Sequence, residues 1–399
     1  MLSVDDARMV VLEHARPLAP QVAALTPSLL GHILAEGVAS DIDSPPFDKA
    51  MMDGYAVRAA DCTGDVVLRV IEEIAAGMVP TQTLTPGTAS RIMTGAPIPP
   101  GADAVVKIEA TAAHPDGVRI FTSASVDSNR LRRGQEMANG EIVLDIGTLL
   151  RPAEFGLLAS MGRTTVSVYP APRVAILSTG SELVEADQTP RGGQIRNSNG
   201  PMLLMQTVRA GGEPHYLGIA SDDPESLRAL LRQGLEYDVL LVSGGVSMGD
   251  YDLVPKMLEE LGVTAHFHKI KLKPGKPLLF GTRGDTLVFG LPGNPVSSFV
   301  CFELIVRAAL EKLRGILTPG PRRWMTPLTA NFAHTTDRET YYPANLDPAQ
   351  GVRPVAWFGS ADLRGITRAN AFIVVPPGEH AFAAGQFVWV MPFDLAGNS

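Results

Sequence analysis

The chain has 399 residues, of which 45% are hydrophobic and 19% are charged, and its formal net charge is −8. This length exceeds one ordinary hydrophobic core, so about two to four domains are expected, and the composition excludes a disordered chain. The negative charge argues against general nucleic-acid binding, which needs a basic face. A polyanion would need a local cationic patch or a bridging metal.

Cysteine content and hydropathy bear on the cellular compartment. Cys62 and Cys301 are the only cysteines. A pair so far apart forms neither a disulfide framework nor a zinc cluster, so we expect two buried, unreactive thiols. The segment MLSVDDARM is acidic where a signal peptide would be basic, and no apolar stretch is long enough to span a bilayer. These features predict a cytoplasmic protein without membrane contact.

The first part of the chain changes from helical to β-rich texture. Ser3 followed by Asp6 is a capping-box pattern and predicts a helix through about His14. A second helix is expected over 28–36, before a proline-rich extended stretch at 41–57. From about 50 to 143, short alternating runs are separated by glycine and proline, which is typical of a β-rich domain with many turns.

From about 172 to 315, strand-like and helical runs alternate. Strands are expected at RVAILST, YLGIAS, DVLLVSGG, 266–271 and LVFGL, and helices at MLLMQTVRAGG, after Pro224, over 254–261 and up to Leu313. Such alternation predicts a parallel, doubly wound sheet, whose ligands bind at the carboxyl ends of the strands. Three loops then become candidates: STGSEL, SGGVSMGDYD and LPGNPVSS. After about Thr318 the pattern indicates a small β domain.

The densest cationic stretch is HKIKLKPGKP. Strand alternation would put Lys269, Lys271 and Lys273 on one face, and the turn at 274–275 would return Lys276 to the same place. Converging ammonium groups predict a site for a multiply charged oxyanion. The alternative is a solvated strand edge whose lysines prevent aggregation.

The loop GLPGNPVSSF leaves a strand and opens a helix, with Asn294 as the expected cap and Pro295 in the first turn. Free N–H groups and the hydroxyls of Ser297 and Ser298 would then face outward at a helix N-terminus, which favours anion binding. An ordinary capped helix is the alternative. The neighbouring lysines favour the anion site.

Carboxylates occur in the other candidate loops. Asp250 and Asp252 follow the glycines of SGGVSMGDYD, and beside a polyanion such carboxylates indicate a bridging Mg²⁺. Helix capping is the alternative for one of them. Glu182 lies at another strand end, whereas Asp222 or Asp223 is expected mainly to cap the helix that starts at Pro224.

Other chemistry finds little support in the residues. His266 and His268 lack partners at metal-ligand spacing, and no nucleophile elbow, Walker loop or zinc motif is present. From the residues alone we expect an enzyme that uses Mg²⁺ to act on a small polyanionic substrate.

Six strings that span nearly the whole chain resemble the MoeA family, which includes the E domain of gephyrin: SPPFDKAMMDGYAV, RIMTGAPIPPGADAVVKIE, ILSTGSEL, SGGVSMGDYD, KLKPGKP and GLPGNPVSS. The resemblance implies a multidomain α/β fold. Its parts would be an elongated domain (1–45 and 141–171), an inserted β-rich domain (46–140), a MogA-like α/β domain (172–317) and a C-terminal β-barrel-like domain (318–399).

The resemblance also implies an activity, in which molybdate is inserted into molybdopterin adenylate, with Mg²⁺, to give molybdenum cofactor and AMP. It implies a homodimer whose cleft joins the α/β and C-terminal domains of one subunit to the inserted domain of the other. Contact with a MogA-type adenylyltransferase is a further expectation.

Site residues follow from the motifs that match the family. The resemblance implies that molybdate is held by Lys273, Lys276, Ser297, Arg338 and Ser360, with Lys269 and Asp222 as less direct matches. It implies catalytic positions at Asp53, Thr94, Glu182 and Asp252, and a metal site at Asp250 and Asp252.

Three positions depart from the family pattern: Lys49, Glu136, and the segment GSADL, which lacks a histidine after Ser360. They leave open a preference for tungstate or a reduced activity. The alternatives are a molybdopterin adenylyltransferase, whose GGTG and RD-x-TPE segments are absent here, and a non-catalytic pterin-binding scaffold.

Overall fold

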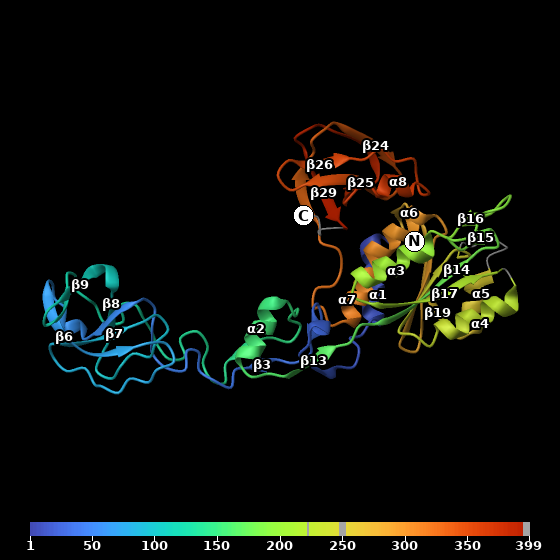
Figure 1. Cartoon of the computed structure of the whole chain (residues 1–399). Coiled ribbons are helices and arrows are strands. Elements are labelled where there is room, and N and C mark those ends of the chain that lie inside the picture. The colour runs from blue at the N-terminus through green and yellow to red at the C-terminus, as the bar shows by residue number, and fades with distance from the viewer. Residues whose placement is uncertain (222, 247–252, 394–399) are drawn as a thin grey trace. The chain divides into compact units, whose positions relative to one another are not determined.

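The computed structural model describes residues 1–221, 223–246 and 253–393, and its chain forms two compact units (Figure 1). The large unit comprises Met1–Ala35, Leu149–Arg151 and Thr165–Ser399. The small unit comprises Glu36–Thr148 and Pro152–Thr164. Each is described by itself below.

The large unit is built on a six-stranded sheet of order β17-β14-β18-β22-β21-β19. Its strands are β14 (Arg173–Thr179), β17 (Glu213–Ala220), β18 (Val239–Ser243), β19 (Thr264–Lys269), β21 (Pro277–Arg283) and β22 (Thr286–Leu291). The strands β17, β14, β18 and β22 are mutually parallel as predicted, but β21 runs antiparallel to both of its neighbours, β22 and β19. The direction reverses because a tight turn joins β21 to β22, with Gly284 at φ +58°.

Helices cover both faces of this sheet (Figure 1). Val174 and Ile176 pack into one core, whereas Ala175 and Leu177 pack into the other, as strand alternation requires. The first core includes α1 (Val4–His14), α3 (Asn199–Arg209), α6 (Pro295–Cys301), a π-helical turn (Phe302–Val306) and α7 (Arg307–Leu313); the second includes α4 (Pro224–Gly234) and α5 (Leu253–Glu260). The predicted doubly wound α/β domain is therefore confirmed.

Helix starts follow the predicted capping chemistry. The Ser3 hydroxyl oxygen accepts from the Asp6 N–H at 3.1 Å, and the Asp6 carboxylate accepts from the Ser3 N–H, so the capping box of α1 is confirmed. The Asp223 carboxylate accepts from the Ser226 N–H at 2.8 Å and caps α4. Asp222 lies outside the described residues.

The helix expected over 28–36 is wrong. A 3₁₀ turn at Pro27–Leu29 ends at once, and Gly31 takes the left-handed conformation, with φ +82°. Beyond it, β2 (Ile33–Leu34) joins a three-stranded sheet with β1 (Gln21–Ala24) and β13 (Thr165–Tyr169). Ile33 and Leu34 are apolar because both are buried on strand β2, and not because they belong to an amphipathic helix.

The C-terminal β domain has the barrel-like closure that was predicted. Strands β25 (Glu339–Asp347), β27 (Ala371–Val375), β29 (Phe387–Pro392) and β23 (Trp324–Pro327) pair in that order, and β26 (Gly351–Pro354) pairs with β25. A bridge between Leu328 and Val352 connects the end of β23 to β26 and closes the ring. Strands β24 (Phe332–Thr336) and β28 (Gly378–Phe382) form a ribbon, and α8 (Leu363–Ile366) is a short helix.

The small unit is β-rich, as expected. Its main sheet has the order β8-β5-β7-β6-β10-β9, with β5 (Gly54–Val57), β6 (Val66–Ile74), β7 (Thr88–Ile92), β8 (Ala104–Lys107), β9 (Thr111–His114) and β10 (Gly117–Ile120). The small unit also contains two short strand pairs, β3 (Val38–Ala39) with β12 (Ile142–Leu144) and β4 (Lys49–Ala50) with β11 (Arg130–Leu131), and the helix α2 (Pro152–Ser160).

The structure bears on the predictions about the two cysteines and about membrane-spanning helices. Cys62 and Cys301 are both buried and unpaired, and burial raises the pKa of the Cys62 thiol to about 11. Within the described ranges, no helix combines the length and apolar character needed to cross a bilayer.

Candidate functional site

Two of the three candidate loops, with the described part of the third, meet around one pocket of the large unit, which we call the strand-end pocket. Its volume is about 760 Å³. It lies where β14, β18 and β22 end, as the strand-end rule predicts. Its lining includes Thr179, Gly180, Glu182, Asn197, Asn199, Ser243, Gly244, Gly245, Gly293, Asn294 and Pro295.

Asparagine side chains tie these loops together. Asn199, at the start of α3, donates from Nδ2 to the Ser243 hydroxyl and to the Gly293 carbonyl, each at 2.8 Å. Gly244 and Gly245 have φ of +92° and +61°, and a Cβ on Gly244 would come within 2.5 Å of the Thr179 carbonyl oxygen. Only glycine fits there, so a ligand can approach the backbone closely.

The acidic part of this pocket is only partly described. Glu182 lines the pocket and is exposed. Asp250 and Asp252, the predicted metal residues, lie outside the described residues. Among the residues that the structure describes, no group of three or more His, Cys, Asp or Glu side chains is arranged to hold a metal ion.

A second pocket of about 550 Å³ lies between the α/β and β domains of the large unit, and we call it the lysine pocket. It gathers the five residues expected around molybdate. These are Lys273, Lys276, Ser297, Arg338 and Ser360, and the remaining lining includes Leu272, Gly275, Asn294, His334, Tyr342, Trp357 and Gly359.

The lysines do not converge by strand alternation. Strand β19 ends at Lys269, and the chain leaves the α/β sheet, so that β20 (Leu272–Lys273) pairs with β25 of the β domain. Lys273 and Lys276 line the lysine pocket, whereas Lys269 and Lys271 do not. The assumption of one continuous strand is therefore wrong.

Hydrogen bonds from both backbone and side chains hold the two sides of the lysine pocket together. Arg338 donates from Nη1 to the Leu272 carbonyl at 3.3 Å. Across the pocket, the Val296 N–H donates to the Ser360 carbonyl and Asn294 Nδ2 donates to the Ser360 hydroxyl, both at 3.0 Å. These contacts place residues of both domains around one cavity.

The start of α6 differs from expectation. Asn294 occupies the cap position, but its side chain makes no capping hydrogen bond to the helix. The N–H of Val296 is occupied by Ser360, and the Ser298 side chain is fully buried and does not line either pocket. Of the two serines expected to face outward, only Ser297 lines the lysine pocket.

Positive charge dominates the lysine pocket. Lys273, Lys276 and Arg338 are the charged residues of its lining. Asp337 pairs with Arg338 at 3.1 Å, and this hydrogen bond, with the charge of Lys273, lowers the pKa of the Asp337 carboxyl. The Asp337 side chain is 73% exposed and does not line the cavity, so it leaves the positive field largely in place.

The two pockets are neighbours. Pro277 and Asn294 line both of them. A larger ligand in the strand-end pocket would therefore lie beside a small oxyanion in the lysine pocket. The arrangement suits a reaction between an oxyanion and a bulky partner.

In the small unit, Asp53 and Thr94 form one exposed polar site. The Asp53 carboxylate accepts from the N–H and from the hydroxyl of Thr94, each at 2.7 Å. These bonds lower the pKa of Asp53. A Cβ on the next residue, Gly54, would lie 1.9 Å from the Val106 carbonyl oxygen, so the tight pairing of β5 with β8 fixes the position of Asp53.

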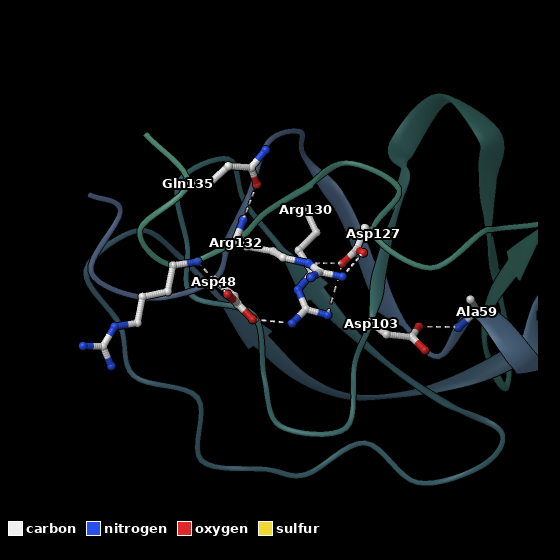
Figure 2. A network of polar contacts seen from close by, with 8 residues as sticks. Asp48, Ala59, Asp103, Asp127, Arg130, Arg132 and Gln135 are labelled. Atoms are coloured by element: carbon white, nitrogen blue, oxygen red, sulfur yellow. Dashed lines mark hydrogen bonds and ion pairs between the residues drawn. The ribbon is translucent and has the colours of Figure 1, made fainter. Parts of the chain in front are cut away.

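Two of the positions that depart from the family pattern contact each other. Lys49 Nζ lies 3.3 Å from Glu136 Oε1, and the Ser44 hydroxyl donates to Glu136 Oε2 at 2.8 Å. Close to this contact, arginine–aspartate ion pairs connect residues of the segment 127–132 to each other and to Asp48. Arg130 pairs with Asp48, and Arg132 pairs with Asp127 (Figure 2). The two departures therefore compensate each other's charge.

His334, Tyr342 and Trp357 were not predicted from the sequence, although all three line the lysine pocket. His334 and Tyr342 lie on β-domain strands, Trp357 follows β26, and no motif marks them. At the third departure, Ala361 follows Ser360 and lines the strand-end pocket.

Comparison with known proteins agrees with the family resemblance. Residues 2–162 match the model of the MoeA N-terminal region (domain I and II), 175–312 that of a probable molybdopterin binding domain, and 326–393 that of the MoeA C-terminal region (domain IV). The chain is 34% identical to the molybdopterin molybdenumtransferase of Bacillus subtilis (strain 168), over 98% of this chain and 94% of that protein. The enzyme of the same name from Staphylococcus aureus (strain MRSA252) is also 34% identical, over 92% of this chain and 90% of its own length.

Solved structures extend this likeness to three dimensions. Two structures of the molybdopterin biosynthesis MoeA protein from Pyrococcus horikoshii are similar, with TM-scores of 0.82 and 0.85 at 31% and 28% identity. The first covers 99% of this chain and 99% of that chain, and the second covers 98% and 100%. With sequence similarity, three family models and the fold in agreement, this chain belongs to the MoeA family.

Proposed function

We propose that this chain is a molybdopterin molybdenumtransferase that inserts molybdate into adenylylated molybdopterin and releases AMP. The observation that carries the proposal is the juxtaposition of two pockets, one cationic and one larger, which share Pro277 and Asn294. The names of the bacterial relatives support the transfer of molybdenum by an enzyme.

In this proposal the lysine pocket holds molybdate. Lys273, Lys276 and Arg338 supply positive charge for a tetrahedral dianion, and the hydroxyls of Ser297 and Ser360 donate to its oxygens. Because these groups come from structured elements of two domains, little reorganisation is needed when the anion binds.

The strand-end pocket would hold the pterin adenylate. Its volume of about 760 Å³ lies in the usual range for ligands of that size, and Gly244 and Gly245 allow phosphate groups to approach the backbone. The two dithiolene thiols would then bond to molybdenum through their sulfurs, and their two protons would leave with one oxide of molybdate as water. Water would cleave the pyrophosphate link to give AMP.

Mg²⁺ is the proposed metal. Glu182 lines the strand-end pocket, and Asp250 and Asp252 belong to the loop that follows Gly245. This donor set consists of carboxylate oxygens, which are the ligands that Mg²⁺ prefers. A bound Mg²⁺ would neutralise phosphate charge during AMP release.

We further propose a homodimer in which the inserted domain of one subunit supplies Asp53 and Thr94 to the cleft of the other. Mixing two inactive variants tests this arrangement. If the cleft joins two subunits, Asp53→Asn and Lys276→Ala, refolded together, should regain about a quarter of wild-type activity, because half of the dimers are mixed and each has one intact site. No recovery would place both residues in the same subunit's site.

Purified protein incubated with molybdopterin adenylate provides the main test. AMP release that requires molybdate and Mg²⁺ supports the proposal. Formation of adenylate from ATP and molybdopterin would support the adenylyltransferase alternative. Tight pterin binding without turnover would support the scaffold. The cytoplasmic location and contact with a MogA-type adenylyltransferase stay predictions, which cell fractionation and co-purification test.

A further inference from the structure

Two of the rings that line the lysine pocket carry unpaired nitrogens. The rings of His334 and Trp357 both line it. His334 Nε2 and Trp357 Nε1 are buried, and neither has a hydrogen-bond partner among the described residues. Native proteins rarely leave a buried polar nitrogen without a partner unless a ligand completes its hydrogen bonding.

The rings form a continuous aromatic wall. Tyr342 packs edge-on against His334, with ring centroids 5.3 Å apart, and against Trp357, with centroids 5.6 Å apart. His334 also stacks on Phe332 at 6.1 Å. This packing holds the two rings without hydrogen bonds to their unpaired nitrogens.

Charge around His334 favours a neutral imidazole before an anion binds. Burial lowers the pKa of His334, and the charges of Lys273 on β20 and His380 on β28 lower it further. Arg338, which also lines the pocket, adds positive charge on the same side. A dianion among these groups reverses the local field, because opposite charge favours the protonated imidazole.

We propose that His334 and Trp357 are two further oxyanion-binding residues: their ring nitrogens donate to oxygens of molybdate, and His334 takes up a proton as the dianion enters. This inference rests on the proposed function of the lysine pocket. It assigns to the aromatic wall a direct part in holding the metal oxyanion.

Proton uptake has a definite sign. The pKa of His334 is higher with the dianion bound than without it, so the bound state holds more protons. Molybdate affinity therefore rises as the pH falls through the bound-state pKa, and levels off below the free-state pKa.

Titration calorimetry with sodium molybdate tests the proposal in the full-length protein. Experiments in buffers of different ionisation enthalpy measure the protons taken up on binding. His334→Phe keeps the aromatic wall but should bind molybdate roughly 3- to 10-fold more weakly and lose the proton uptake. His334→Gln keeps a donor, so it should regain much of the affinity without the uptake. Trp357→Phe should weaken binding by a similar factor and keep the uptake.

Matched controls share the chemistry but not the pocket. His215 lies on β17 and Trp389 is half exposed on β29; neither lines the cavity. The variants His215→Phe and Trp389→Phe should bind molybdate within about twofold of wild type.

The outcomes separate the two proposals. Wild-type affinity and proton uptake in both His334 variants would overturn the role of His334, and wild-type affinity in Trp357→Phe would overturn that of Trp357. If the wild-type protein binds no molybdate, or if Lys276→Ala has no effect, the proposed function of the pocket fails first.

Discussion

Replacing Lys276 by alanine removes one of three positive charges from the lysine pocket. At about 4 Å and an effective dielectric constant near 20, an ammonium group attracts a dianion by roughly 8 kcal/mol before desolvation is counted. Lys276 is exposed, so water and salt screen most of this attraction. A loss of about 2 kcal/mol remains, which corresponds to roughly 30-fold weaker molybdate binding.

Calorimetric titration with molybdate at constant ionic strength measures this loss. Lys276→Arg keeps the charge and should retain most of the affinity. Lys256→Ala removes an exposed lysine from α5 that lines neither pocket, and is the matched control. Lys269→Ala distinguishes the sequence-based prediction from the structure. Strand alternation predicts weaker molybdate binding, whereas the structure predicts little change in affinity, because Lys269 does not line the lysine pocket. A dissociation constant within twofold of wild type for Lys276→Ala would refute the oxyanion assignment.

Three further changes test the packing around the sites. Glu303 is fully buried and bonds two arginines of the large unit, so Glu303→Ala should lower the free energy of unfolding by about 3 kcal/mol, measured in urea. Thr94→Val removes a hydroxyl bond to Asp53, so the carboxyl pKa, followed by NMR, should rise toward its ordinary value. Because the pKa of Asp53 is lowered in the folded protein, this carboxylate stabilises the fold above its ordinary pKa, and the stabilisation is lost as the pH falls through the folded-state pKa. Thr94→Val should therefore lose less folding stability than wild type on acidification. A Cβ on Gly275 would lie 2.6 Å from Cys301 Sγ, so Gly275→Ala should lower the Tm and weaken molybdate binding. Adding Cys301→Ala should recover part of both losses. An unchanged Tm in Gly275→Ala would show that the turn accommodates the extra methyl group.

Local chemistry explains what could be predicted from the sequence. The capping box at Ser3 depends on neighbouring residues, and the apolar runs of β14 and β18 are buried on both faces. The topology of an alternating α/β segment then brings the candidate loops together, because parallel strands end at the same edge.

Contacts distant in sequence explain most of the errors. Nothing near Lys273 indicates that β20 pairs with β25 in another domain, so the lysines appeared to share one strand. The apolar run at 29–34 suits a helix locally, but Gly31 breaks it and β13 pairs with the remainder. His334 and Trp357 carry no motif, and only the folded β domain brings them to the pocket.

Two hydrogen bonds, from Asn294 and Val296 to Ser360, connect the α/β domain to the β domain of the large unit. Lys276 and Ser297 lie on one side of these bonds, whereas Lys273, on β20, pairs with the β domain that carries Arg338 and Ser360. If these bonds broke and the domains separated, the lysine pocket would lose one of its two sides. The strand-end pocket would lose only Ala361 from its lining. Release of these two bonds would therefore open the lysine pocket to the exchange of a small anion, while a ligand in the strand-end pocket would keep most of its contacts.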